Sequence, residues 1–159
     1  MNIDQIEILE VDVGTVRPLR TRVLRPNYEE GVLLEYDGDD RQDAHHFAAV
    51  ETDEESIVGV VSYLPESIPV DDESAGIRLR GMAVAAQRRR TGIGSHLLST
   101  TLPRVALHKP GLSRVWAAAR TSVTEFYARH GFKPVGSRFE IPDAGPHQRM
   151  IRDLPQVIA

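Results

Sequence analysis

Cysteine is absent from this sequence of 159 residues. Its absence excludes disulfide bonds, thiolate metal ligands and a cysteine nucleophile. No apolar run approaches the roughly 20 residues that a helix needs to cross a bilayer, so we expect no membrane partner. The first residues also lack the basic stretch and apolar core that are typical of a secretory signal. We therefore expect a cytoplasmic protein.

An excess of positive charge is missing as well. The 19 Lys and Arg residues face 23 Asp and Glu residues, which gives a formal net charge of -4. General nucleic-acid binders are usually basic, so we expect no nucleic-acid partner. The hydrophobic fraction of 41% is typical of a globular protein, and the length predicts a single domain over residues 1–159. The oligomeric state stays open, with a homodimer as one alternative.

Residues 79–94 are the most informative stretch. An apolar strand, a basic turn and two glycines, Gly92 and Gly94, precede a helical apolar pattern that begins at Ile93. The first N–H groups of a helix have no intrahelical partner, and the helix dipole adds roughly half a positive charge there, so this order predicts an anion site. The glycines allow a phosphate to approach the main chain closely. The alternative is an ordinary helix start beside a solvated basic turn.

The spacing of the glycines narrows the choice of phosphate ligand. A dinucleotide fingerprint needs a third glycine, where Leu97 stands, and the Gly-Lys-Ser/Thr of a Walker loop is absent. The sequence Arg-Arg-Thr-Gly-Ile-Gly at 89–94 resembles the R/Q-x-x-G-x-G/A loop of the GNAT superfamily of N-acetyltransferases, which binds the pyrophosphate of acetyl-coenzyme A. Residues 126–132, Phe-Tyr-Ala-Arg-His-Gly-Phe, resemble the aromatic-Tyr-x-x-x-Gly-Phe helix of that superfamily. Residues 145–150 look like the Pro-His-x-x-Met ending of its ElaA-like branch.

The resemblance implies a coenzyme site. In the family, the backbone of the strand before the loop pairs with the pantetheine amides, as an added strand would, and the loop holds the pyrophosphate. Family members often carry Asn at the position of Arg120, so two roles stay open for this arginine: contact with a phosphate, or capping of the strand end. The residues that the resemblance implies for coenzyme binding are Met82, Ala83, Val84, Arg89, Arg90, Thr91, Gly92, Ile93, Gly94 and Arg120.

Two residues are predicted to be catalytic. By resemblance, Tyr127 points its hydroxyl at the coenzyme sulfur. Acetyl transfer also needs a neutral amine, so an ammonium must lose a proton before attack, yet residues 77–84 contain none of the acids that the family often uses for this step. The remaining candidates for the base are Glu51, Glu140, Asp143 and His147. His147 is predicted as a catalytic residue, with a core histidine as the equally weighted alternative.

These residues predict an N-acetyltransferase. We expect it to move an acetyl group from acetyl-coenzyme A, its cosubstrate, to a primary amine by direct transfer, without a metal. The acceptor is expected to be a small-molecule amine or an amine of a protein or peptide. The alternative is a non-catalytic sensor or interaction module that binds acyl-coenzyme A on the same fold. The acid missing from the middle strand favours this alternative, and Tyr127 opposes it.

The order of elements predicts an α/β fold. Strands are expected over 6–11, 44–51, 57–64, 77–84, 112–120, 132–139 and 147–154, and helices over 13–24, from 93 onward and over 122–130. Hairpin-linked strands pair antiparallel, whereas the strand–helix–strand unit from 79 to 120 should place its strands parallel. The result is one central mixed, mostly antiparallel, twisted sheet with helices on both faces, as in the GNAT fold.

Three local expectations concern polar residues. The arginines of the first helix, among them Arg20, are expected on the side away from its apolar positions. Residues 37–40, Asp-Gly-Asp-Asp, are expected to form a solvated turn. Ser122 and Glu125 have the form of a capping box at the start of the short helix, and Gly131 is placed to end that helix.

Overall fold

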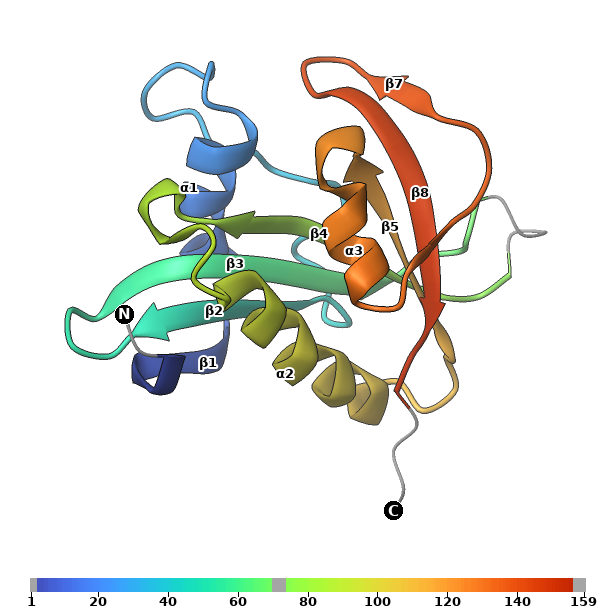
Figure 1. The fold of residues 1–159 in the computed structure, drawn as a ribbon, viewed down its shortest axis with the longest axis horizontal. Helices are drawn as coiled ribbons and strands as arrows, with labels where there is room; N and C mark the ends of the chain where they lie inside the picture. The colour runs from blue at the N-terminus through green and yellow to red at the C-terminus, as the bar shows by residue number, and fades with distance from the viewer. Residues whose placement is uncertain (1–2, 70–73, 156–159) are drawn as a thin grey trace. The chain divides into compact units, whose positions relative to one another are not determined.

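The computed structural model describes residues 3–69 and 74–155, so the acidic segment 71–73 lies outside the described residues. The strands among them are hydrogen-bonded in the order β1-β2-β3-β4-β5-β8-β6, with β7 beside β8 (Figure 1). The elements are β1 (Ile6–Val11), α1 (Val13–Leu24), β2 (His45–Glu51), β3 (Ser56–Pro65), β4 (Ile77–Val84), α2 (Ile93–His108), β5 (Arg114–Arg120), α3 (Thr124–Arg129), β6 (Lys133–Pro134), β7 (Phe139–Ile141) and β8 (Gly145–Asp153), with short 3-10 turns η1 (Ile3–Gln5), η2 (Ala86–Arg88) and η3 (Thr121–Val123). No helix in this part of the chain has the length and apolarity needed to span a membrane.

The predicted mixed sheet is confirmed. β1, β2 and β3 pair antiparallel in chain order, β4 pairs with β5 in parallel, and β5 pairs with β8 antiparallel. The single strand expected over 132–139 is wrong, because the chain forms the two short strands β6 and β7 there. Gly136 lies between them with a φ of 74°, a left-handed conformation that interrupts an extended strand.

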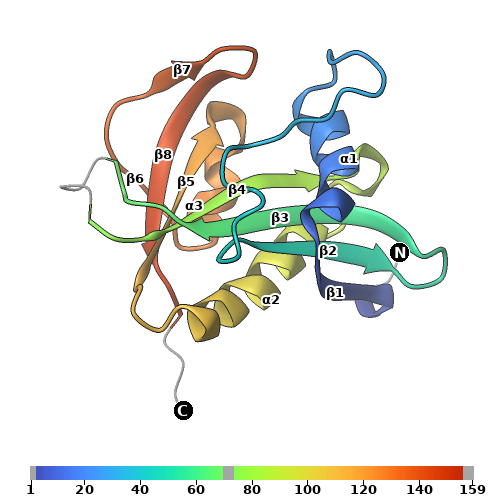
Figure 2. The same ribbon diagram turned by 180° about the vertical axis from the view of Figure 1, so that it is seen from behind.

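By the density of its contacts the chain divides into two compact units. The first contains Met1–Tyr63 and Gly81–Thr101, and the second contains Leu64–Arg80 and Leu102–Ala159. In the first unit, α1 and α2 cover opposite faces of the β2–β3 pair, as the two opposed views show (Figures 1 and 2). Val60 belongs to the buried cluster of α1, whereas a Cβ at the neighbouring Gly59 would lie 3.1 Å from the side chain of Ile93 in α2. Because successive residues of a strand point to opposite faces, this alternation matches the placement of the two helices.

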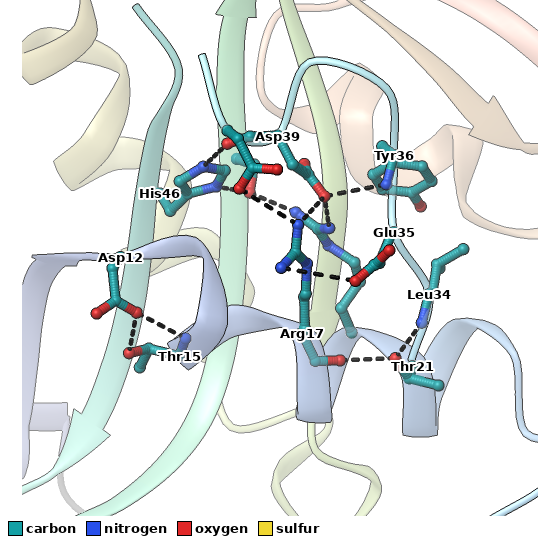
Figure 3. Close-up of polar contacts among 12 residues, drawn as sticks. Asp12, Thr15, Arg17, Thr21, Leu34, Glu35, Tyr36, Asp39 and His46 are labelled. Atoms are coloured by element: carbon teal, nitrogen blue, oxygen red, sulfur yellow. Dashed lines mark hydrogen bonds and ion pairs between the residues drawn. The ribbon is translucent and has the colours of Figure 1, made fainter. Parts of the chain in front are cut away.

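The most buried charge in the first unit is Arg20 of α1, whose side chain has no exposed surface. Its Nη1 donates to Asp39 Oδ2 at 2.8 Å, and its Nη2 donates to Ser62 Oγ at 2.8 Å. Asp39 Oδ2 also accepts the backbone N–H of Tyr36 at 3.0 Å (Figure 3). The expected outward position of Arg20 and the fully solvated turn at 37–40 are therefore wrong. Buried charges persist when they are paired and hydrogen-bonded, and helical spacing alone does not reveal a partner 19 residues away.

His46 of β2 extends this buried network. Its Nε2–H donates to the carbonyl oxygen of Asp39 at 3.0 Å, since a carbonyl can only accept. Its Nδ1 lies 2.6 Å from Ser62 Oγ. The neighbouring His45 is half-buried, with Nδ1 3.1 Å from Glu10 Oε2. The contacts of Arg20 and His46 tie the segment after α1 to both β2 and β3.

In the second unit, β5 pairs with β8 along its whole length, and α3 packs against this pair (Figure 1). Arg152 of β8 shows which face of the sheet α3 covers, because its Nη1 donates to the carbonyl oxygen of His130, directly after α3, at 2.7 Å. Trp116 of β5 is buried, and its Nε1–H donates to the carbonyl oxygen of Glu66 at 3.0 Å. Trp116 lies directly opposite Ile151 of β8, the residue before Arg152. Opposite residues share a face and successive residues of a strand alternate, so Trp116 and Arg152 point to opposite faces of the sheet.

The sequence predicted the C-terminal end of α3 and failed at its start. The capping box is wrong: η3 precedes α3, and Val123 takes the N-cap position without a side-chain cap bond. At the other end, the N–H of Phe132 donates to the carbonyl of Tyr127, and that of Gly131 donates to the carbonyl of Ala128, both at 3.1 Å. With Gly131 at a φ of 86°, this is a Schellman motif. The expected role of Gly131 at the end of α3 is confirmed, and these two hydrogen bonds fix the C-terminal end of the helix.

Replacing Gly81 by alanine tests how closely α1 and β4 are packed. Gly81 has a φ of 64°, and a Cβ there would lie 2.6 Å from Nε of the buried Arg20. The positive φ costs about 1–2 kcal/mol, and overpacking typically adds about 1–3 kcal/mol. We expect Gly81→Ala to lower the free energy of unfolding by about 2–4 kcal/mol, measured by urea titration.

Gly111→Ala is the matched control, because a Cβ there meets no heavy atom within 4 Å and its φ is not positive. It should change the stability by less than about 0.5 kcal/mol. Equal stabilities of the two variants would contradict the close contact between Gly81 and Arg20.

Candidate functional site

The residues predicted to bind the coenzyme begin in the second half of β4. Along this strand buried and half-buried residues alternate, and Met82 and Val84 are half-buried while Ala83 is buried. The parallel ladder between β4 and β5 covers Ile77–Leu79, and residues 82–84 lie beyond it. After Val84, the N–H of Ala85 donates to the carbonyl of Val58 at 2.9 Å. The end of β4 is thereby held to β3, and the chain then turns through η2.

The predicted pyrophosphate loop joins η2 to α2. Arg90 and Gly92 both adopt left-handed conformations, with φ of 64° and 87°. The carbonyl of Gly92 accepts the N–H of His96 at 2.9 Å, so Gly92 is the N-cap residue of α2. The N–H groups that follow, beginning with Ile93 and Gly94, belong to the first helical turn, which has no intrahelical acceptors for them. This end of the helix therefore has the polarity that favours an anion.

The main chain of this loop is accessible. Arg89, Arg90, Thr91 and Gly92 are exposed, and a Cβ added at Gly92 would meet no heavy atom of the described residues within 4 Å. The space beside Gly92 is large enough for a ligand oxygen to approach the backbone. These observations fit a phosphate-bearing ligand at the loop.

Arg88 differs from the two arginines after it. Its Nε and Nη2 donate to Glu51 Oε2 at 3.2 and 3.0 Å. Glu51 is 8% exposed, so this carboxylate, one of the candidates for the base, is occupied by holding η2 to β2. The ion pair anchors the start of the loop and leaves Arg89 and Arg90 as its exposed cations.

Tyr127 lies in α3, in the second unit. Its side chain is buried, with the ring centroid 5.4 Å from that of Phe126 and 5.3 Å from that of Phe132, both in edge-on geometry. Its carbonyl is the acceptor of the Schellman motif described above. The ring is therefore held by packing and by the end of its helix.

Arg120 and His147 form a cross-strand pair at one end of the β5–β8 ladder, so their side chains share a face of the sheet. His147 is buried, and its Nδ1–H donates to the carbonyl of Gly145 at 2.8 Å. In the neutral imidazole, Nε2 is then the nitrogen that accepts a proton. Its geometry is consistent with a general base.

Tyr127 and His147 do not come from the same face of the second unit. Arg152 contacts the end of α3, whereas His147, five residues earlier on β8, points to the other face by strand alternation. Glu140 and Asp143, the other two candidates for the base, are both exposed. Arg149 was not predicted from the sequence, although it lies on the same face of β8 as His147. The period-two spacing along the last strand was the signal that could have found it.

The family of the chain follows from comparison with known proteins. Residues 15–132 match the model of the acetyltransferase (GNAT) family. The chain belongs to this family. Over 149 residues it is 30% identical to the uncharacterized N-acetyltransferase YitI of Bacillus subtilis, covering 94% of this chain and 97% of YitI. The resemblance drawn from the glycine loop and the Tyr127 segment is confirmed.

Solved structures agree with this membership. ElaA of Escherichia coli superposes with a TM-score of 0.71 and 26% identity, covering 92% of this chain and 99% of that one. This likeness supports the ElaA-like branch predicted from the last strand. An aminoglycoside 6′-N-acetyltransferase complexed with coenzyme A has the same fold, with a TM-score of 0.65 and 19% identity over 96% of this chain and 99% of that one.

Replacing Gly92 by valine tests the predicted pyrophosphate site. The new side chain would occupy the open space beside the loop and would keep a phosphate from the backbone N–H groups. We expect the affinity for coenzyme A, measured by calorimetry, to fall by an order of magnitude or more.

Gly31→Val controls for the strain of the substitution itself. Gly31 has a φ of 85°, and a Cβ there also meets no heavy atom within 4 Å, so both variants carry the same kind of backbone strain. Gly31→Val should bind coenzyme A as the parent does. Unchanged affinity in a folded Gly92→Val variant would remove the pyrophosphate assignment.

Proposed function

We propose that this protein is an acetyl-coenzyme A-dependent N-acetyltransferase that acetylates a primary amine by direct transfer. The observation that carries the proposal is the accessible glycine loop at the N-terminus of α2, in a chain of the GNAT family. The acceptor is a small-molecule amine or an amine of a protein or peptide. The non-catalytic alternative is not favoured by the comparisons, since YitI is named an N-acetyltransferase.

The roles of the coenzyme-binding residues follow from their chemistry. The N–H groups of residues 90–94 would bind the pyrophosphate, with the side chains of Arg89 and Arg90 adding charge; the N–H of Arg89 itself donates to the carbonyl of Ala86. The backbone of Met82, Ala83 and Val84 would pair with the pantetheine amides as one strand pairs with another. A backbone N–H directed at the thioester carbonyl would stabilise the charge that develops on its oxygen. The thioester supplies the acetyl group, and the protein supplies position and polarity.

The two predicted catalytic residues, His147 and Tyr127, would transfer protons during the reaction. The neutral amine forms a bond to the acetyl carbon, the carbon–sulfur bond breaks, and the coenzyme leaves as a thiolate. His147 Nε2 would accept the proton that the ammonium loses before attack and pass it to solvent. The nitrogen loses a second proton to solvent as the amide forms, and the Tyr127 hydroxyl would donate a proton to the thiolate and regain one from solvent. The base thus acts at nitrogen and the acid acts at sulfur.

The variant Tyr127→Phe tests this assignment, because it keeps the ring and its packing and removes the hydroxyl. Release of free thiol from acetyl-coenzyme A is measured with a panel of amines, in single turnovers, beside a coenzyme titration. Turnover should fall by roughly 10²–10⁴-fold, the usual worth of a positioned acid or base, while coenzyme affinity stays at the parent value.

Tyr28→Phe is the matched control, since Tyr28 is 37% exposed and lies outside the proposed site; it should turn over like the parent. Full activity of Tyr127→Phe would mean that the thiolate leaves without this acid. Coenzyme binding without thiol release by the parent protein, over the whole panel, would favour the non-catalytic module.

A further inference from the structure

One face of the sheet in the second unit is rich in arginine. It is the face opposite to α3, and it carries His147 and Arg149 of β8. Their register partners on β5 are Arg120 and Ala118. Directly opposite residues of an antiparallel pair share a face, and diagonal neighbours lie within reach of long side chains. Arg120 and Arg149 are therefore neighbours, with the methyl group of Ala118 leaving room beside Arg149.

β7 adds an aromatic ring to this face. Phe139 pairs with His147 in the register of β7 and β8. Its ring centroid lies 4.0 Å from the guanidinium carbon of Arg149 and 5.9 Å from the imidazole of His147. A ring beneath a guanidinium orients the cation without neutralising it. Among the described residues, Arg149 has this ring as a neighbour and no carboxylate within ion-pair distance.

β4 extends the same face with Arg78 and Arg80, which alternate with buried residues. Arg78 pairs with Trp116 in the parallel register, and its guanidinium carbon lies 4.8 Å from the indole centroid. Its Nη1 also donates to Glu66 Oε2 at 3.0 Å. The four half-buried arginines of this face, called the arginine face below, are Arg78, Arg80, Arg120 and Arg149.

Such a cluster has a clear chemical preference. Half-buried guanidinium groups repel one another, and an oxyanion placed among them gains charge-assisted, often bidentate hydrogen bonds. Arg78 of this face is paired with Glu66, whose Oε2 lies 3.0 Å from its Nη1. The uncompensated charge lies at Arg149, beside His147, the predicted base.

We propose that the arginine face binds an anionic group, a carboxylate or a phosphate, on the amine that is acetylated. The acceptor class is thus an amine that also carries a small oxyanion, held by Arg149 while its nitrogen faces His147. This inference rests on the proposed function, because it assigns a substrate class to the same site.

The positive charge of the arginine face also acts on the amine itself. Nearby cations disfavour an ammonium and lower its pKa, so a larger fraction of the bound acceptor is neutral and nucleophilic. This protein has no acid in residues 77–84, and with the pKa of the bound ammonium lowered, a weaker base is sufficient to deprotonate it. The anionic group supplies the attraction that a simple alkylammonium would lack.

Matched acceptor pairs test the inference with the parent protein. One series consists of ω-amino acids with one to five methylene groups, each beside its primary amide, which keeps the shape and removes the charge. A second pair is 2-aminoethyl phosphate beside ethanolamine. Thiol release should show kcat/KM at least about 10-fold higher for the anionic member of one or more pairs, since the neutral member lacks the charge-assisted hydrogen bonds to the guanidinium. The series that responds separates carboxylate from phosphate.

The variant Arg149→Gln tests whether the preference for an anionic acceptor depends on Arg149. It should raise KM for the anionic acceptor and reduce the preference to less than about 3-fold, while the coenzyme affinity stays at the parent value. Arg129→Gln, an exposed arginine on α3, is the matched control and should keep the preference. A preference that survives in Arg149→Gln would overturn the role of Arg149.

Direct binding separates this inference from the proposed function. Calorimetric titration of the coenzyme-bound protein with the same pairs does not require turnover. Tighter binding of the anionic members supports the inference even if no thiol is released, in which case the proposed transfer fails alone. Thiol release at equal rates from acids and amides, with equal binding, would overturn the inference and leave the transferase proposal standing.

Discussion

The buried ion pair between Arg20 and Asp39 is the interaction on which the first unit depends. It joins α1 to the segment after it, and its hydrogen bonds continue to β2 and β3 through Ser62 and His46. Removing one partner of such a pair leaves a buried charge without compensation and costs about 3–5 kcal/mol. The pair therefore holds together, in one buried network, segments that the sequence separates by up to 42 residues.

The candidate functional residues of the two units are held by different kinds of constraint. In the first, a salt bridge from Arg88 to Glu51 anchors the start of the glycine loop, and the N-cap carbonyl of Gly92 begins α2. In the second, Tyr127 is held by aromatic packing and by the Schellman motif that follows it. Both devices set the backbone before a ligand arrives, which lowers the entropy that binding and reaction must overcome.

Much of the fold could be predicted from the sequence, because its signals are local. Strand alternation, helical spacing and the glycine at position 131 gave the bounds of β1, α1 and β4 and the end of α3. The helix start at Ile93 could also be predicted from the glycines before it, whereas the binding of a phosphate there stays a prediction. The start of α3 failed because Ser122 entered a 3-10 turn, where its capping-box pattern with Glu125 does not apply. The position of Arg20 and the stacking of Phe139 on Arg149 depend on partners distant in the sequence, which local patterns do not contain.

The absence of a Cβ at Gly81 couples three positions of the sequence, 81, 20 and 39. The space that its Cβ would occupy is filled by the guanidinium of Arg20. A lineage that acquires a side chain at position 81 must shorten or reroute the side chain at position 20, and a shorter residue at 20 leaves Asp39 without its cation. The three positions should therefore change together among relatives, although they lie in α1, a turn and β4. In this chain the glycine therefore leaves room for the buried guanidinium of Arg20, in addition to allowing the positive φ at this position of β4.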